Sequence, residues 1–180
     1  MNWRETRARL REDRDRLRAH LLAEGGHRTL PLWMNPSFQA VALQRLSHLF
    51  YSRGYRLLGR FLWHSNVMLT GADLSMICDI GGGFLMPVPA GIILISARIG
   101  RNCTVWPQGG LGGGMRSNAD IGGGPGLPVL GDGVELGWGA IVMGPVRVGN
   151  GARIGPLSLV TRDVPDGGNV PPGEGQYRDS

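Results

Sequence analysis

The sequence contains no lysine, because all 19 of its basic residues are arginine. Schiff-base chemistry on lysine and contacts from lysine to phosphate are therefore excluded. Cysteine is scarce as well, since Cys78 and Cys103 are too few for a disulfide framework. No run of about 18 apolar residues is present, and the first residues form no apolar signal segment. We therefore expect a cytoplasmic protein with no membrane partner.

Acidic residues are fewer than basic ones, which gives a net charge of +5 and a pI near 10.2. This balance would suit an acidic partner. However, seven of the arginines lie in residues 1–20, where Glu5, Glu12, Asp13 and Asp15 are interleaved with them. Mixed charge of this kind is typical of a solvated helix face, so we expect no binding to nucleic acid.

The chain divides into three predicted parts. Residues 1–70 carry apolar residues at helical spacing and are predicted to be an α-helical region, with Asn35 as an N-cap before Pro36. Residues 71–166 have a different period, which predicts a mainly β structure. Residues 167–180 are expected to form a flexible tail.

A six-residue period runs through the second part. Each repeat has a long aliphatic residue, usually followed by glycine, and a small residue four positions later. This period is neither that of an α-helix nor that of an alternating strand, and it is typical of hexapeptide-repeat β-helices. Three repeats make one triangular coil, and the coils stack because none can bury its inward residues alone. The aliphatic positions are Leu130, Leu136, Val142, Val148, Ile154 and Val160.

The same period appears earlier, in two runs offset by one residue. The small inward positions expected there include Cys78, Ala90 and Cys103, so both cysteines are interpreted as core residues rather than reactive thiols. Residues 112–129 interrupt the repeat and are predicted to be an external loop, for which a functional role and a plain spacer are both open. The aliphatic positions are Leu74, Ile80, Met86 and Ile92 in the first run and Ile93, Ile99, Val105 and Leu111 in the second.

Residues 37–48, with an Arg-x-x-His pattern at Arg45 and His48, resemble a helix of the serine O-acetyltransferases. Residues 72–113 and 130–165 resemble the first and last coils of that family. The resemblance implies a left-handed parallel β-helix with an N-terminal α-helical region, assembled as a homotrimer or as a pair of trimers. It also implies a site between subunits, where a histidine base helps transfer acetyl from coenzyme A to a serine hydroxyl.

Carried over residue by residue, the catalytic set of this family is incomplete. The aspartate that orients the base falls on Asp73, which is retained and is our candidate catalytic residue. The Asp-His pair that contains the base falls on Pro87-Val88, and neither side chain accepts a proton. The Arg-His pair of the loop falls on Gly126-Leu127. The predicted substrate positions are Pro87, Val88, Leu127 and, just before the coils, His64.

The positions that border coenzyme A in the family are also altered. Its Gly-Ala-Gly-Ala corner reads Gly-Trp-Gly-Ala at residues 137–140, and a tryptophan there would either narrow the groove or form a new wall. Acetyl-CoA or another acyl-CoA is expected as cosubstrate only, with no tightly bound cofactor. The predicted cofactor-binding positions are Gly112, Gly113, Trp138, Gly139 and Ala140.

Two further partners are not expected. Family members that dock into cysteine synthase end in isoleucine, whereas this chain ends in Arg178-Asp179-Ser180. Residues 72–180 contain no histidine, so the three-histidine zinc site of some β-helix proteins is excluded and no metal is expected.

Three functions are compatible with these residues. The first is a trimeric acyltransferase that uses coenzyme A or another pantetheine thioester and acts on a small hydroxyl or amine without the histidine base. The second is a former acetyltransferase whose cleft now serves other small-molecule chemistry. The third is a non-catalytic trimer that binds a partner. His48 is interpreted as a structural residue between the helices and the coils, and Asp73 could equally be a turn residue.

Overall fold

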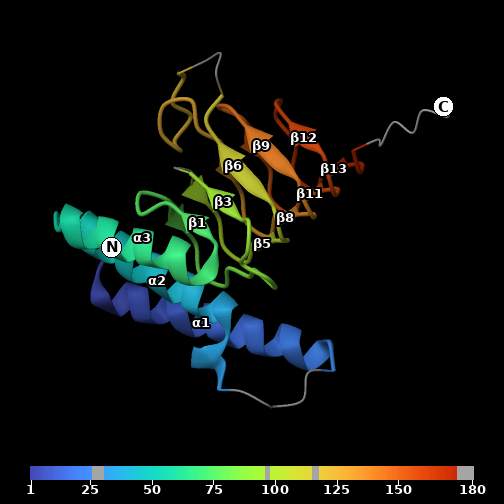
Figure 1. The fold of residues 1–180 in the computed structure, drawn as a ribbon. Helices are drawn as coiled ribbons and strands as arrows, with labels where there is room; N and C mark the ends of the chain where they lie inside the picture. Colours follow the sequence, from blue (N-terminus) through green and yellow to red (C-terminus); the bar gives the residue numbers. More distant parts are fainter. Residues whose placement is uncertain (26–30, 96–97, 115–117, 174–180) are drawn as a thin grey trace, which may run out of the picture.

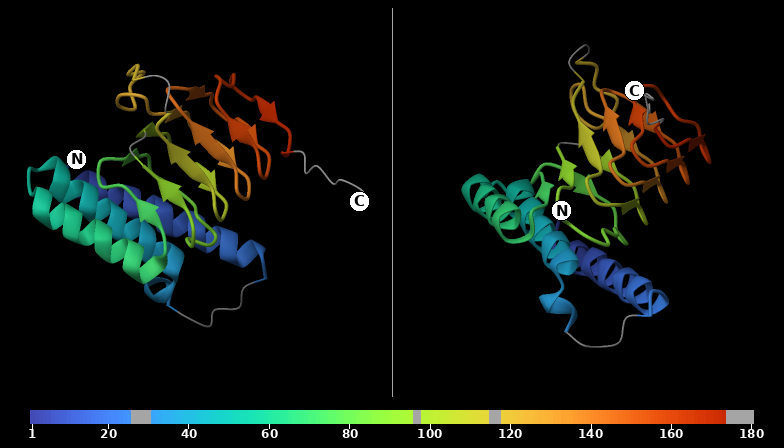
Figure 2. Two further views of the ribbon diagram at one scale, coloured as in Figure 1. Left: turned by 45° about the horizontal axis from the view of Figure 1, so that its top comes forward. Right: turned by 45° about the vertical axis from the view of Figure 1, so that its right-hand side comes forward.

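A layer of helices packs against one end of a stack of short strands (Figure 1). The computed structural model describes residues 1–25, 31–95, 98–114 and 118–173. Figure 2 shows the helices at one end of the stack and the last strands at the other, which confirms the predicted N-terminal helical region. The helical elements are α1 (Trp3–Ala23), the 3-10 turn η1 (Leu32–Met34), α2 (Pro36–Ser52) and α3 (Arg56–Thr70).

The helix ends follow from local side chains. The side chain of Asn2 accepts a hydrogen bond from the backbone N–H of Glu5 at 2.9 Å and caps α1. Asn35 caps α2 in the same way through Ser37 N–H at 2.9 Å, as predicted. The end of α3 is Gly71, whose φ of 72° lies in the left-handed region that glycine adopts readily.

The described strands form three parallel sheets, which are the three faces of the coils. Sheet A consists of β1 (Asp73–Leu74), β3 (Ile93–Leu94), β6 (Gly110–Gly112), β9 (Ile141–Met143) and β12 (Leu159–Val160), in that order. Sheet B consists of β2 (Asp79–Ile80), β4 (Arg98–Ile99), β7 (Val129–Leu130) and β10 (Arg147–Val148). Sheet C consists of β5 (Thr104–Val105), β8 (Glu135–Leu136), β11 (Arg153–Ile154) and β13 (Asn169–Val170).

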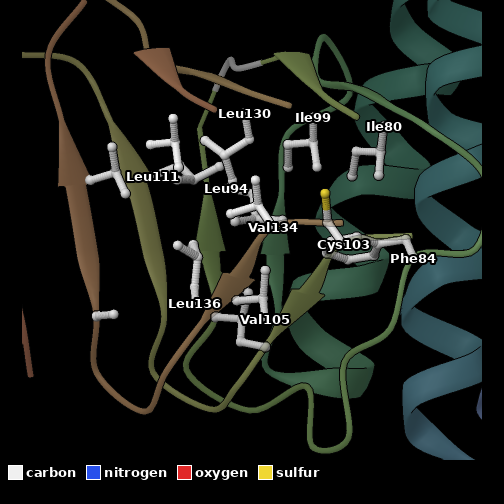
Figure 3. Packing of buried hydrophobic residues seen from close by; sticks show 14 of the residues in the cluster. Ile80, Phe84, Leu94, Ile99, Cys103, Val105, Leu111, Leu130, Val134 and Leu136 are labelled. Atoms are coloured by element: carbon white, nitrogen blue, oxygen red, sulfur yellow. The ribbon is translucent and has the colours of Figure 1, made fainter. Parts of the chain in front are cut away.

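The core is a set of inward aliphatic residues that lie above one another in successive coils (Figure 3). In sheet A, for example, Leu111 pairs with Val142, and Val142 with Val160. The inward positions predicted from the final six-residue run are confirmed, because all of them are buried. Cys78 and Cys103 are also buried in this core, and burial raises the pKa of the Cys103 thiol to about 11, so almost no thiolate forms near neutral pH.

The register differs from the prediction in the second coil. Leu74 pairs with Leu94, 20 residues later, whereas Leu136 pairs with Ile154, 18 residues later. The early coil is therefore two residues longer. As a result, Leu94 faces inward, whereas Ile93, which was predicted to face inward, is 46% exposed. Ala90, predicted as a small inward residue, is exposed at the corner that takes up the extra length. Both assignments were therefore wrong.

The coil stack continues beyond the predicted boundary at residue 166. β13 pairs in parallel with β11, so residues 169–170 add a strand to sheet C where a flexible tail was predicted. The terminal Arg178-Asp179-Ser180 lies outside the described residues. The repeat is interrupted between β6, which ends at Gly112, and β7, which begins at Val129, so the first and last residues of the predicted loop 112–129 belong to strands.

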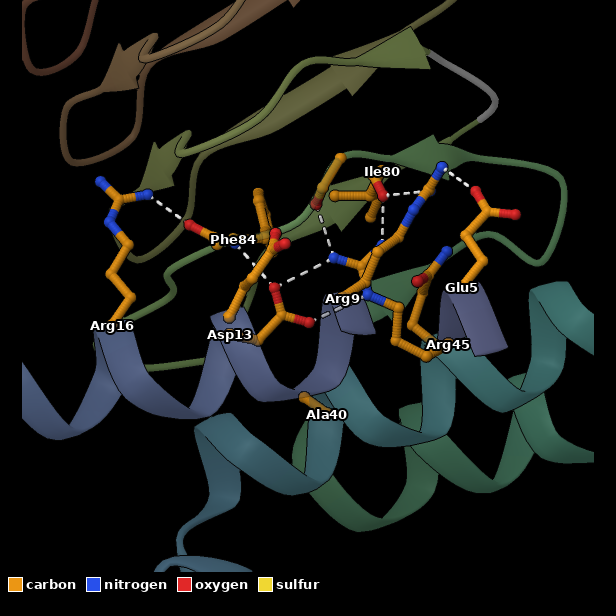
Figure 4. A network of polar contacts seen from close by, with 12 residues as sticks. Glu5, Arg9, Asp13, Arg16, Ala40, Arg45, Ile80 and Phe84 are labelled. Atoms are coloured by element: carbon orange, nitrogen blue, oxygen red, sulfur yellow. Dashed lines mark hydrogen bonds and ion pairs between the residues drawn. The ribbon is translucent and has the colours of Figure 1, made fainter. Parts of the chain in front are cut away.

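The first coil has no neighbouring coil on its outer edge, and side chains of α1 and α2 bind its free carbonyl groups (Figure 4). Arg45 of α2 donates to the carbonyl oxygens of Ile80 and, at 2.6 Å, Gly81. Arg9 of α1 donates to Ile80 O at 2.7 Å. The remaining pairs are Ser37 with Pro87 O, Gln44 with Cys78 O, His48 with Met76 O and Arg16 with Gly83 O. An exposed edge of this kind otherwise leaves backbone groups unpaired.

A buried ion pair holds this contact together. The guanidinium of Arg45 lies 3.0 and 3.1 Å from the two carboxylate oxygens of Asp13, and the two side chains are only 1% and 2% exposed. Asp13 also accepts a hydrogen bond from the backbone N–H of Phe84 at 2.8 Å. The pair therefore joins α1, α2 and the first coil at one point.

We predict that Arg45→Ala lowers the free energy of unfolding by about 3–5 kcal/mol, because it leaves the Asp13 carboxylate buried without its cation. Urea denaturation followed by circular dichroism measures the change. Arg53→Ala, at an exposed arginine that ends the same helix, should change it by less than about 0.5 kcal/mol. Equal stability of the two variants would contradict the role given to this ion pair.

Candidate functional site

Asp73 lies on the outward side of sheet A, where α3 meets the first coil. Its Oδ1 accepts a hydrogen bond from Trp63 Nε1 at 2.7 Å. The other carboxylate oxygen has no hydrogen-bond partner among the described residues. The side chain is half-buried, so α3 fixes one carboxylate oxygen and leaves the other available to a ligand.

Apolar side chains extend from Asp73 across sheet A. The register places Asp73 beside Ile93, Ile93 beside Gly110, and Ile141 beside both Gly110 and Leu159. Sheets B and C instead present mainly charged or polar outward residues, such as Arg98, Arg147, Glu135 and Arg153. The exposed apolar side chains of sheet A, which we call the sheet A face, are Ile93, Ile95, Ile141, Met143 and Leu159.

Val88 and Trp138 lie along one edge of the stack, where the chain passes from sheet C to sheet A. Turns stack on this edge, because Gly139 N donates to Pro107 O at 3.0 Å and Leu157 N donates to Trp138 O at 2.7 Å. In the first coil the same turn contains Val88, which is 47% exposed. Two coils further on it contains Trp138. The predicted base position and the predicted pantetheine wall therefore share an edge of the molecule.

Trp138 stands out from this edge and is 52% exposed. Its ring lies nearly parallel to that of Trp106, with centroids 6.3 Å apart. The Trp106 indole N–H donates a hydrogen bond to Glu135 Oε1 at 2.8 Å, which fixes the orientation of the Trp106 ring. Gly139 has a φ of 63°, and a Cβ there would lie 2.9 Å from Leu157 Cδ2, so this turn favours glycine. Ala140, by contrast, is fully buried in the core.

The other predicted positions lie at the opposite end of the strands of sheet A. Gly112 ends β6, and a Cβ on Gly113 would lie 3.5 Å from Leu127 in the returning part of the loop. Gly114 N also donates to Gly126 O at 3.2 Å. Since all strands of this sheet are parallel, Gly112, Gly113 and Leu127 lie together but apart from the edge of Val88 and Trp138.

The histidines of the helices fall into different environments. His64 is exposed on α3, next to Trp63, with ring centroids 5.1 Å apart. His48 is half-buried, and one ring nitrogen lies 2.9 Å from the carbonyl oxygen of Met76. Burial lowers the pKa of His48. This position supports the structural role expected for His48.

Sequence reasoning missed Trp63, the partner of Asp73. Nothing in the sequence marks this residue, because the contact arises only when α3 folds back onto β1 ten residues later. Among the described residues, no cluster of three or more metal-ligating side chains is present. None of the described helices is long and apolar enough to cross a membrane.

Comparison with known sequences finds serine acetyltransferases among the relatives of this chain, although no family model matches. The chain is 34% identical to the serine acetyltransferase of Mycobacterium tuberculosis over 131 residues, which are 72% of this chain and 55% of that protein. It is 31% identical to the Escherichia coli serine acetyltransferase over 136 residues, 75% of this chain and 48% of the relative. The chain thus spans about half the length of these relatives.

Comparison with solved structures gives the same result. Soybean serine acetyltransferase complexed with serine has a TM-score of 0.81 and 27% sequence identity, over 94% of this chain and 68% of that one. The Neisseria gonorrhoeae serine acetyltransferase has a TM-score of 0.80 and 27% identity, over 91% of this chain and 61% of that one. The likeness therefore includes the helical layer as well as the coils.

We predict that stability falls as the pH is lowered below about 6.5, the ordinary pKa of histidine. The lowered pKa of folded His48 means that the unfolded chain takes up a proton first, which favours unfolding. In His48→Gln, whose amide can still donate to Met76 O, the loss between pH 7 and pH 5 should be smaller. The control His64→Gln, at an exposed histidine, should keep the full loss; identical pH profiles for both variants would contradict this role.

Proposed function

Because the chain is a member of the serine O-acetyltransferase-like hexapeptide-repeat proteins, we propose that it is an acyltransferase without the histidine base of that family. It takes an acyl group from coenzyme A or another pantetheine thioester and transfers it to a small hydroxyl or amine, at a site between subunits of a homotrimer with left-handed coils. The observation that supports this most is the shared edge of Val88 and Trp138, whose first turn is hydrogen-bonded through Gly91 N to Gly71 O, two residues before Asp73.

The homotrimer is supported by the sheet A face. Five exposed aliphatic or methionine side chains on one sheet are an unusual surface for a protein that stays monomeric. Asp73 lies at the margin of this face and His64 on the adjoining helix α3. A neighbouring subunit that covers sheet A would bring its own residues close to both. The loop residue Leu127 of one subunit would then complete the site of another.

We predict that Leu159→Glu converts the assembly to monomers, because it would bury a carboxylate without a partner in the subunit contact. Multi-angle light scattering gives the mass directly. Asn169→Glu places the same charge on the exposed outward side of sheet C and should leave the mass unchanged. A natural protein that is monomeric at micromolar concentration would refute the proposed assembly.

Asp73 suits an amine acceptor better than a hydroxyl. A carboxylate is a weaker base than an imidazole, so it is less suited than the histidine of the family to take a proton from a hydroxyl. It is, however, a good partner for an ammonium group. The ammonium first loses one proton to the solvent. The neutral amine then attacks the thioester carbon, the C–S bond breaks, and the leaving thiolate takes up the second proton, which the nitrogen releases as the amide forms. We therefore favour an amine acceptor bound by the free oxygen of Asp73.

Calorimetric titration with acetyl-CoA tests the proposal first. We predict micromolar binding by the natural protein and a change in affinity for Trp138→Ala, since the exposed indole borders the thioester arm. Trp3→Ala, at another exposed tryptophan, whose ring lies against Phe50 near the C-terminal end of α2, is the matched control and should bind as the natural protein does. Absence of binding by the natural protein and by Trp138→Ala would rule out the acyl-CoA proposal.

Turnover is tested with a panel of small amines and hydroxyl compounds by following free thiol release. We predict that Asp73→Asn lowers the activity towards amines by about tenfold or more, because a charged hydrogen bond is lost, while the circular dichroism spectrum is unchanged. Full activity in this variant would remove Asp73 from the site.

A repurposed cleft is the second candidate. It is favoured by the apolar residues at two separate positions, Val88 and Leu127, where the resemblance expects histidines. Apolar lining of this kind suits a less polar ligand than serine. Binding of acetyl-CoA by Trp138→Ala but not by the natural protein would support this second function, because the indole would then close the old groove. A non-catalytic trimer is the remaining alternative and would bind no acyl-CoA.

A further inference from the structure

One face of α1 carries a row of arginines along its whole length. Arg4, Arg7, Arg11, Arg14 and Arg18 are all exposed and follow one another at steps of three, four, three and four residues. At 100° per residue, these steps keep the five side chains within a stripe about 80° wide, and the row is about 21 Å long. We call this surface the arginine stripe.

The acidic residues of α1 point mostly away from the arginine stripe. Glu5 pairs with Arg9 at 2.6 Å, and Glu12 pairs with Arg101 of the coils at 2.9 Å. Asp13 is buried against Arg45. Three of the four acids that alternate with arginine in the sequence therefore pair on the side that contacts the coils, as Figure 4 shows for Glu5 and Asp13, and the solvated side that the sequence predicted carries mainly arginine.

The arginines of the stripe are mostly without partners. Arg14 pairs with its exposed neighbour Asp15 at 2.7 Å. Arg4, Arg7, Arg11 and Arg18 form no ion pair or hydrogen bond with any described residue. Four uncompensated positive charges in a row repel one another, which is a cost that an anionic partner would relieve.

We propose that the arginine stripe is the docking surface for an acidic α-helix of a partner protein, with carboxylates spaced three and four residues apart. Such a helix repeats every 5.4 Å per turn, as α1 does, so that successive carboxylates meet successive guanidinium groups. Arginine also binds carboxylates in a bidentate manner, which lysine cannot do. The stripe lies on the side of α1 opposite the coils, so the inference does not depend on the proposed acyltransferase activity.

Two other anionic partners fit this surface less well. A nucleic-acid strand presents a phosphate about every 3.4 Å along its axis, whereas the arginines recur about every 5.3 Å. A membrane surface would need an apolar face on α1 to insert. The buried Leu17 and Thr6 show that the less polar side of this helix is already packed against the protein.

Binding of a labelled peptide tests the proposal. The probe is a 21-residue Glu/Ala helix with five glutamates at steps of three, four, three and four, and its fluorescence anisotropy is followed with the full chain in low salt. A second peptide of the same composition has its glutamates distributed evenly around the helix. We predict that the first peptide binds about tenfold more tightly than the second, since only it can engage the whole row.

Variants of the protein complete the test. The triple change Arg7→Gln, Arg11→Gln and Arg18→Gln should weaken binding of the first peptide by about tenfold or more. The control Arg53→Gln, Arg98→Gln and Arg153→Gln removes the same charge from exposed positions elsewhere and should weaken it less than about twofold. Equal binding of both peptides, or equal effects of the two triple variants, would overturn the proposal. Stripe-dependent binding of a DNA duplex or of anionic vesicles, without binding of the peptide, would overturn it too.

Discussion

The open edge of the first coil is the constraint on which the rest of the structure depends. A stack of parallel coils satisfies its backbone by pairing each coil with the next, so the outermost coil has unpaired carbonyl groups. Each such group costs about 1–3 kcal/mol if it is buried without a partner. Here side chains of α1 and α2 bind six of these carbonyls, at residues 76–87. The helices and the coils therefore stabilise each other.

The arginines that bind the open edge of the first coil carry charges that must be neutralised. This requirement determines the charge on both faces of α1. A buried guanidinium such as that of Arg45 needs a carboxylate, and Asp13 supplies it from α1. Glu5 and Glu12 pair with Arg9 and Arg101 on the same side of α1, at partly exposed positions. The acidic residues of α1 thus pair mostly on the side of the helix that faces the coils. The opposite side carries mainly arginine. The charge of the outer surface is a consequence of how the inner surface is neutralised.

The sequence predicted the six-residue repeat but not the side-chain contacts between the helices and the first coil. Six-residue spacing identifies inward residues such as Leu136 correctly, because every coil imposes the same alternation. It fails at Ile93, where two extra residues at a corner change the register. The partners of Arg45 and Asp73 could not be predicted either. Asp13 lies 32 positions before Arg45, and Trp63 reaches Asp73 only after α3 has packed.

The candidate site lies on exposed corners, so the packing of the fold depends little on which side chains occupy them. Val88 is half exposed in a turn that Ser37 holds through a hydrogen bond to Pro87 O, so the side chain at this position contributes little to the core. Trp138 likewise projects outward from the stack. Asp73 differs from both, because an indole N–H and the margin of the sheet A face fix its position. A carboxylate with one oxygen bound and one free, beside an apolar face, is a group placed for a cationic ligand. In the acyl transfer proposed above, Asp73 is therefore the residue that we place next to the acceptor.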